Sequence, residues 1–318
     1  MLQCLKRHPN FMTMKTLKSV QNYTEFFMEV QTVMDCPRES NFTKQELYRM
    51  ELRFCCNASQ RLFLTQENTR VGQRITYEAE RAFTKTVDQE VFHMLPKTAP
   101  WWTESNLQRC AVVGNGGILR NSSCGDEIDS ADFIIRLNLP PMNYSSDIGV
   151  MTHLVTINPS QITNSFRGLK YSRKSFVKQA ASYGRAALMT AAFSYTANTD
   201  IAFRVLHTMR DMRPQQEVLF INPDYLFNLD RFWRQKGHAA IRLSSGFMLV
   251  NTALELCQKV DLYGFWPFSV TPQQQSLLHH YYDNVGPVKG VHQMTEEFLR
   301  LLQMHNEGVL QVHVGECH

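Results

Sequence analysis

Between Cys110 and Trp266 the chain alternates short apolar runs with longer amphipathic segments. The apolar runs are continuous, as strands buried on both faces require. They are CAVVG (110–114), DFIIRLN (132–138), HLVTIN (153–158), AALMTAAF (186–193), EVLFIN (217–222), AAIRL (239–243) and VDLYGFW (260–266). Helical spacing marks PDYLFNLDRFWRQKG (223–237), which ends on a glycine, and GFMLVNTALELCQKV (246–260). The pattern predicts an α/β fold with a mainly parallel, Rossmann-like central sheet flanked by helices in one domain.

The N-terminal part of the chain lacks this rhythm. Residues 1–54 are polar and mixed, which is typical of a helical or loosely ordered stem, and we expect the main domain to span residues 55–318. No run approaches the roughly 18 apolar residues of a membrane span. The first residues, MLQCLKRHPNFMTMK, contain no apolar signal-peptide core either.

Composition excludes some function classes. The 318 residues are 43% hydrophobic and 19% charged, which describes a globular protein. The net charge of +4 is compatible with an acidic substrate, but no dense Lys/Arg run is present. Nucleic acid is therefore not an expected partner.

Cysteines and glycosylation sequons bear on the compartment. Of the eight cysteines none forms a C-x-x-C pair, which disfavours a zinc or thioredoxin-type site. Five N-x-[ST] sequons begin at Asn22, Asn41, Asn57, Asn121 and Asn143. An even cysteine count together with five sequons favours the lumen of the secretory pathway.

The segment GNGGIL, which follows the first apolar run, is a glycine turn but not a dinucleotide fingerprint. Leu119 stands where the third glycine of G-x-G-x-x-G belongs, and the second strand ends in Arg136 and Asn138 instead of a carboxylate, so NAD is disfavoured. We expect the glycines to let backbone N–H groups approach a phosphate at a helix N-terminus. The chain has no Asp-x-Asp metal pair, and the nearest match, Glu127-Ile128-Asp129, is expected within a helix after the turn.

Three expected strands end in asparagine, at Asn138, Asn158 and Asn222. Ligands of parallel sheets bind beyond the carboxyl ends of the strands, where an amide offers both a donor and an acceptor. Asparagine is also a common residue for leaving a strand, and both interpretations stay open.

Four segments, in this order, resemble the sialylmotifs of animal sialyltransferases. CAVVGNGGILRNSSCGDEIDSADFIIRLNLPP (110–141) is similar to the large motif, and RLSSGFMLVNTALELCQKVDLYGFWPF (242–268) to the small one. HHYYDN (279–284) resembles motif III, and HQMTEE (292–297) the His-x4-Glu very small motif. Within the family, the chain is most similar to the α2,8-sialyltransferases of the GD3-synthase-like, mono- and oligosialylating branch.

The resemblance implies a GT-A-like variant of the fold and an activity. The family transfers sialic acid from CMP-sialic acid with inversion and without a metal or other cofactor. The implied acceptor is O8 of a terminal sialic acid on a glycolipid or glycoprotein. The implied location is the Golgi lumen, where family members are membrane-anchored, although no anchor is visible here. The alternative hypothesis is a catalytically silent relative that binds sialoglycans. The intact histidines argue against it.

The resemblance also assigns residues. His292 matches the general base on the acceptor hydroxyl, and a helix N-terminus behind it disfavours the charged imidazole. His280 matches the group that stabilises the departing CMP phosphate. The expected donor-binding residues are Asn115, Asn138, Ser244, Ser245, Gly246, Trp266 and His279. Ser245 departs from the Ser-Thr-Gly usual in the subfamily by one methyl group. For Trp266, packing in the core is an equal alternative, and Glu297 is expected to orient rather than to act as an acid.

The family pairing implies disulfides between Cys110 and Cys257 and between Cys124 and Cys317. Buried free thiols are the alternative. The resemblance leaves Cys4, Cys36, Cys55 and Cys56 unassigned.

Overall fold

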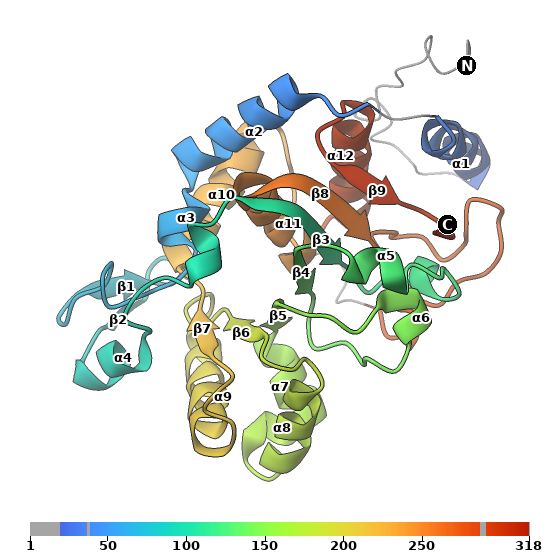
Figure 1. Cartoon of the computed structure of the whole chain (residues 1–318). Helices are drawn as coiled ribbons and strands as arrows, with labels where there is room; N and C mark the ends of the chain where they lie inside the picture. Colours follow the sequence, from blue (N-terminus) through green and yellow to red (C-terminus); the bar gives the residue numbers. More distant parts are fainter. Residues whose placement is uncertain (1–19, 37–38, 287–290, 318) are drawn as a thin grey trace.

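The computed structural model describes residues 20–36, 39–286 and 291–317 (Figure 1). Its strands are β1 (Arg74–Thr76), β2 (Thr84–Thr86), β3 (Leu107–Val113), β4 (Phe133–Arg136), β5 (Leu154–Ile157), β6 (Ala187–Thr190), β7 (Val218–Phe220), β8 (Cys257–Tyr263) and β9 (Gln311–His313). Its α-helices are α1 (Val20–Met34), α2 (Phe42–Cys55), α3 (Ala58–Arg61), α4 (Gln89–Met94), α5 (Gly125–Asp129), α6 (Ser145–Ile148), α7 (Pro159–Phe166), α8 (Arg173–Ala181), α9 (Thr199–Met212), α10 (Pro223–Gln235), α11 (Ser245–Leu256) and α12 (Met294–Asn306).

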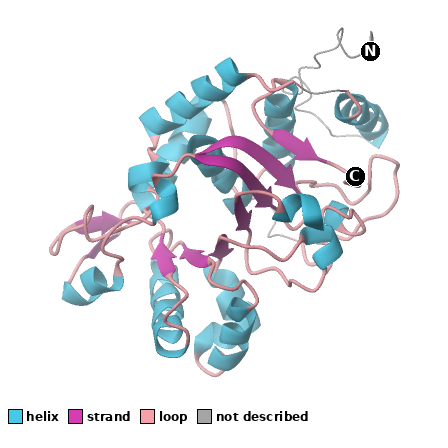
Figure 2. Cartoon of the chain, viewed as in Figure 1, coloured by secondary structure: helices cyan, strands magenta, loops and turns pink. Residues whose placement is uncertain are grey.

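The expected central sheet is present. Seven strands pair in the order β7-β6-β5-β4-β3-β8-β9, and every pairing between them is parallel. Strands β4, β5 and β6 are buried along their whole length, which explains their uninterrupted apolar sequences. Helices lie on both faces of the sheet (Figure 2).

The strand order reverses at β3. One neighbour of β3 is β4, which follows it in the chain, and the other is β8, which comes much later. The register aligns Val113 with Tyr263, so β3 and β8 end side by side. In parallel sheets, this kind of switch point opens a crevice at the carboxyl ends of the strands.

Two expectations about elements are wrong, and one strand was not predicted. AAIRL (239–243) is not a strand: Ile241 is exposed, and the segment leads into α11 without joining the sheet. The helical pattern expected to continue through residue 260 ends at Leu256, because Cys257–Tyr263 form β8. The short edge strand β9 was not predicted, since three residues, two of them polar, give no strand signal.

The N-terminal helices pack on the main domain. Phe26 and Phe27 of α1 are buried, and the Phe27 ring lies 5.5 Å from the ring of Trp266 and 5.2 Å from that of Phe268. Leu52 of α2 belongs to the same apolar core. A stem role for residues 1–54 stays a prediction, but the described part of this segment shares the core of the domain.

A buried carboxylate joins α11 to α12. Glu297, in the first turn of α12, accepts a hydrogen bond from the backbone N–H of Ser244 at 2.7 Å. Desolvation by burial raises the pKa of Glu297 to about 7, with the Ser244 hydrogen bonds opposing this shift and the charge of Glu296 adding to it. Glu297 thus lies at the start of α12 and contacts the α11 cap, while its expected role, as an orienting or helix-start charge, stays a prediction.

We expect Phe27→Ala to lower the free energy of unfolding by about 3 kcal/mol, because it empties an aromatic contact in the core. Met28→Ala on the same helix is the control, since Met28 is 61% exposed. Urea unfolding followed by circular dichroism measures both. Equally small losses of unfolding free energy in the two variants would mean that α1 does not unfold cooperatively with the rest of the domain.

The raised pKa of Glu297 predicts that the free energy of unfolding depends on pH. Its pKa is raised in the folded protein from 4.5 to about 7, so the folded state holds a proton that the unfolded state releases. This proton stabilises the folded state fully below pH 4.5. As the pH rises through 7, the stabilisation is lost and the free energy of unfolding falls by about 3 kcal/mol. The difference in unfolding free energy between wild type and Glu297→Gln should therefore change over this range. Glu90→Gln, at an exposed position of α4, should show no such change; parallel profiles for all three proteins would refute the prediction.

Candidate active site

A cavity of about 1250 Å³ opens at the carboxyl ends of the strands, above the β3/β8 switch point. Its wall includes every residue that we expected to act in catalysis or donor binding: Asn115, Asn138, Ser244, Ser245, Gly246, Trp266, His279, His280 and His292. These residues come from four separate sequence segments, and the fold brings them together at one site.

The glycine turn does not have the role that we expected. The backbone N–H groups of Gly114 and Gly116 donate to the carbonyls of Tyr263 and Gly264 at 2.7 and 2.9 Å, and that of Gly117 donates to His279 at 3.2 Å. They are thus not free for a phosphate. The turn also leads into a short 3-10 helix, Gly117–Leu119, rather than a helix long enough for such a site; Glu127 and Asp129 do lie in a later helix, α5.

Close backbone contact is the reason for the glycines. A Cβ atom at Gly114 would lie 2.7 Å from the Gly264 carbonyl oxygen, and one at Gly116 would lie 2.6 Å from it. At Gly117 a Cβ would collide with the Leu278 carbonyl. The turn therefore connects the end of β3 to the end of β8 and to residues 279–284, the histidine segment.

Asn115 carries the clearest sign of a ligand. Its side-chain Nδ2 donates to the Leu137 carbonyl at 2.8 Å, while its Oδ1 is buried with no hydrogen-bond partner among the described residues. A buried acceptor without a partner is costly, so this oxygen needs a donor from a bound molecule or water.

The ligand-binding and strand-exit interpretations apply to different residues among Asn138, Asn158 and Asn222. Asn138 adopts a left-handed backbone (φ 63°), and its Oδ1 accepts from the Asn158 N–H at 3.1 Å, so both lie at the cavity wall. Asn222 caps α10 through its Oδ1, which accepts from the Asp224 N–H, and does not line the cavity. The plain strand-exit interpretation holds for Asn222.

The N-terminus of α11 faces the cavity. Ser244 caps it, its Oγ accepting from the Phe247 N–H at 3.0 Å, and Ser245 and Gly246 form the first turn. A Cβ on Gly246 would come within 3.1 Å of both Leu137 and Phe265, so this turn lies close to the ends of β4 and β8.

The histidine segment 279–284 is fastened to the glycine turn. Besides the Gly117 contact, Tyr281 donates its N–H to the Asn115 carbonyl at 3.0 Å. His280 Nδ1 lies 2.7 Å from the Asp283 carboxylate, and the ring stacks on Tyr282. Burial, together with the neighbouring His280, lowers the pKa of His279. Tyr281 is buried.

His292 precedes α12 and lines the same cavity. Its Nδ1 lies 2.9 Å from the backbone carbonyl of Arg242. A carbonyl can only accept, so Nδ1 carries a proton, and in the neutral form of the ring Nε2 keeps its lone pair. The geometry presents Nε2 as a proton acceptor.

Trp266 is mainly a packing residue. Its ring contacts Phe27, Phe268 and Phe298, and its Nε1 donates to the Val270 carbonyl at 2.7 Å. It also borders the cavity. A contact with the donor stays a prediction, while packing already explains the residue.

Three further cavity residues were missed by the sequence analysis. Arg242 forms an ion pair with Glu78 at 2.8 Å and lies over the ring of Tyr195. Arg242 begins the small motif, a signal that was available. Glu78 and Tyr195 belong to segments with no recognisable pattern.

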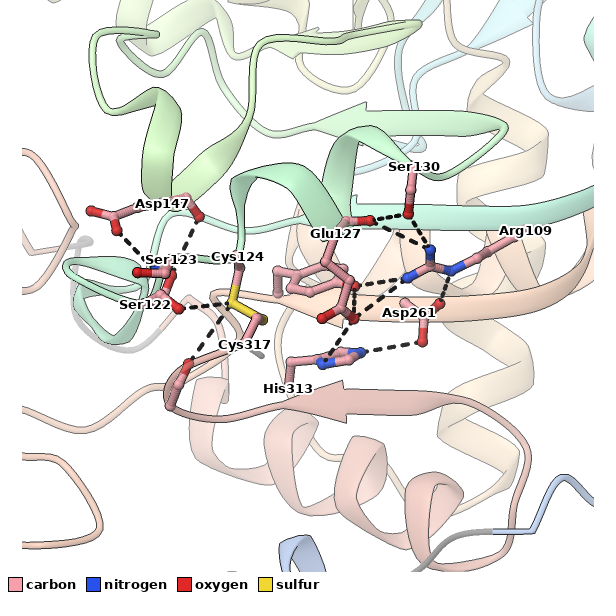
Figure 3. The surroundings of a disulfide bond; sticks show 12 residues. Arg109, Ser122, Ser123, Cys124, Glu127, Ser130, Asp147, Asp261, His313 and Cys317 are labelled. Carbon is pink, nitrogen blue, oxygen red and sulfur yellow. Dashed lines mark hydrogen bonds and ion pairs between the residues drawn. A yellow bond between two sulfur atoms is a disulfide. The ribbon is translucent and has the colours of Figure 1, made fainter.

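Both expected disulfides are present. Cys110 is bonded to Cys257 across β3 and β8, and Cys124 to Cys317 (Figure 3). The structure adds a bridge between the adjacent Cys55 and Cys56, and Cys36 is disulfide-bonded too, while Cys4 lies outside the described residues.

A polar network lies beside the Cys124–Cys317 bridge (Figure 3). Arg109 contacts Asp261 at 2.6 Å, and the ring of His313 lies between Asp261 and Glu127. Among the described residues, Glu127, His313 and Cys317 form the one group with metal-ligand spacing. It lies outside the cavity, and Cys317 is already in a disulfide.

The sequons differ in their surroundings. Asn41, Asn121 and Asn143 are exposed, whereas Asn57 is half-buried, and the side chain of Asn22 lies outside the described residues. Asn41 and Asn57 also cap helices α2 and α3. Among the described residues, no helix has the length and apolar character needed to span a bilayer.

Comparison with known proteins identifies the family. The profile of glycosyltransferase family 29 (sialyltransferase) matches residues 63–309. Human alpha-2,8-sialyltransferase 8E is 41% identical over 317 residues, 99% of this chain and 84% of the relative. Mouse alpha-2,8-sialyltransferase 8F is 43% identical over 310 residues, 95% of this chain and 78% of the relative.

A solved structure supports the fold. A mammalian sialyltransferase in complex with Gal-beta-1-3GalNAc-ortho-nitrophenol is 22% identical, covers 89% of this chain and 99% of its own, and gives a TM-score of 0.57. Family profile, relatives and fold agree: the chain belongs to glycosyltransferase family 29, the sialyltransferases.

Proposed function

We propose that this protein transfers sialic acid from CMP-sialic acid to O8 of a terminal sialic acid on a glycolipid or glycoprotein glycan. The relatives that cover most of the chain are named as α2,8-sialyltransferases. The observation that carries the proposal is the orientation of His292, whose Nδ1–H is held by the Arg242 carbonyl while the ring lines the cavity.

In this reaction His292 Nε2 accepts the proton of the acceptor hydroxyl. The hydroxyl oxygen attacks the anomeric carbon of the donor sugar, and the bond from that carbon to the CMP phosphate breaks on the opposite face, which inverts the configuration. His280 stabilises the charge on the departing phosphate, with its own Nδ1 held by Asp283.

The donor nucleotide lies, in this proposal, between the glycine turn and the α11 N-terminus. The unpartnered Oδ1 of Asn115 accepts from a hydroxyl or amino group of the cytidine. Ser244, Ser245 and Gly246 supply hydroxyl and N–H donors to the phosphate or the donor carboxylate. Asn138, His279 and Trp266 complete the donor side.

We infer that no metal takes part and that the reaction occurs in the Golgi lumen. A nucleotide monophosphate carries less charge than a diphosphate, so histidine and amide donors suffice to neutralise it. The disulfides and the exposed sequons suit the same compartment.

Transfer from CMP-sialic acid should occur to sialylated lactosylceramide or a sialylated O-glycan, but not to their asialo forms. EDTA should not change the rate, because no step uses a metal. Radiolabelled transfer measures both. Inhibition by EDTA would contradict the metal-free mechanism, and CMP binding without any transfer would point to a silent binding relative.

His292→Ala should lower kcat by about 10²–10⁴-fold, because it removes the general base. CMP affinity, measured by calorimetry, should stay at the wild-type value. The control is His207→Ala, at an exposed position of α9. Wild-type turnover in the His292 variant would exclude it as the base.

A further inference from the structure

Arg242 is the one arginine or lysine that lines the cavity among the described residues. Its backbone carbonyl orients His292, and its own N–H donates to the Val291 carbonyl at 3.3 Å. Arg242 therefore lies on the acceptor side of the site, next to the proposed base.

The guanidinium is fixed through Nε and Nη2, and its free edge is the Nη1 amino group. Nε donates to Glu78 Oε1 at 3.2 Å, Nη2 lies 2.8 Å from Glu78 Oε2, and Nη2 donates to Ser194 Oγ at 2.8 Å. Nη1 has no hydrogen-bond partner in the described part of the chain, and the side chain keeps 26% of its surface exposed. A preoriented guanidinium with a free edge is suited to bind a second carboxylate.

Both substrates of the proposed reaction carry a carboxylate. The donor's carboxylate or phosphate has the N-terminus of α11, and the acceptor's carboxylate needs a partner close to His292. A neutral, asialo acceptor lacks this carboxylate and would gain nothing from a cationic partner at this position. Charge-assisted hydrogen bonds to arginine distinguish the two kinds of acceptor.

We propose that the free edge of Arg242 binds the carboxylate of the acceptor sialic acid and so makes the enzyme selective for sialylated acceptors. This role rests on the proposed α2,8 transfer. Glu78 and Ser194 hold the guanidinium in place, and Tyr195, 5.4 Å below it, supports its face.

The test compares an acceptor with and without its negative charge. Sialyllactose and its C1 carboxamide have the same shape, and kcat/KM is measured for both with wild type, Arg242→Gln and Arg242→Lys. Arg231→Gln, an exposed arginine on α10 outside the cavity, is the matched control.

Wild type and the Arg231 variant should prefer the carboxylate acceptor by on the order of 10- to 100-fold. In Arg242→Gln this preference should disappear, through a loss confined to the carboxylate acceptor. Arg242→Lys should recover part of it. An equal loss for both acceptors would assign the Arg242 side chain only to the structure of the site, and an undiminished preference would exclude the contact; each result overturns the inference.

Binding separates this inference from the proposed reaction. The Kd of sialyllactose for the CMP-loaded protein is measured by calorimetry in the same variants. An inactive wild type whose sialyllactose affinity still depends on Arg242 would refute the reaction and keep the contact. Equal affinity in wild type and Arg242→Gln would refute the contact whatever the activity.

Discussion

The backbone of the glycine turn, residues 114–117, is the contact on which the rest of the site depends. Its N–H groups reach the end of β8 and the histidine segment at once, through Tyr263, Gly264 and His279. Such short approaches leave no room for a Cβ atom. Asn115 projects from the same turn, so one backbone feature positions the donor-side amide and the segment that carries His280.

The two histidines proposed to act in catalysis are oriented in different ways. His280 has an anionic partner, the Asp283 carboxylate, whereas His292 has a neutral one, the Arg242 carbonyl. In the proposed reaction, the anionic partner orients a ring that faces the donor phosphate, and the neutral partner orients a ring that accepts the proton of the acceptor hydroxyl. The different partners of Nδ1 are thus what distinguishes the two imidazoles in the proposed reaction.

The sequence predicted the parallel sheet and the residues gathered at its edge, because long apolar strands and the four motifs are local patterns. It did not predict what depends on distant contacts. The glycines suggested phosphate binding, but their N–H groups bond to Tyr263, Gly264 and His279, which no local pattern reveals. The packing of Phe27 on Trp266 was missed for the same reason. AAIRL resembles a strand, yet it does not join the sheet in the described structure and leads into α11 instead.

The position of β3 has a consequence for how the protein is made. Its partner β8 and the cysteine of the Cys110–Cys257 bridge come 147 residues after Cys110 in the chain. During synthesis one edge of β3 therefore stays open, with its backbone unpaired, until most of the domain has been translated. Pairing at such separation is slow, and an open strand edge invites association with other chains. The site at the switch point is therefore completed late, and the Cys110–Cys257 bridge can form only after Cys257 has been made.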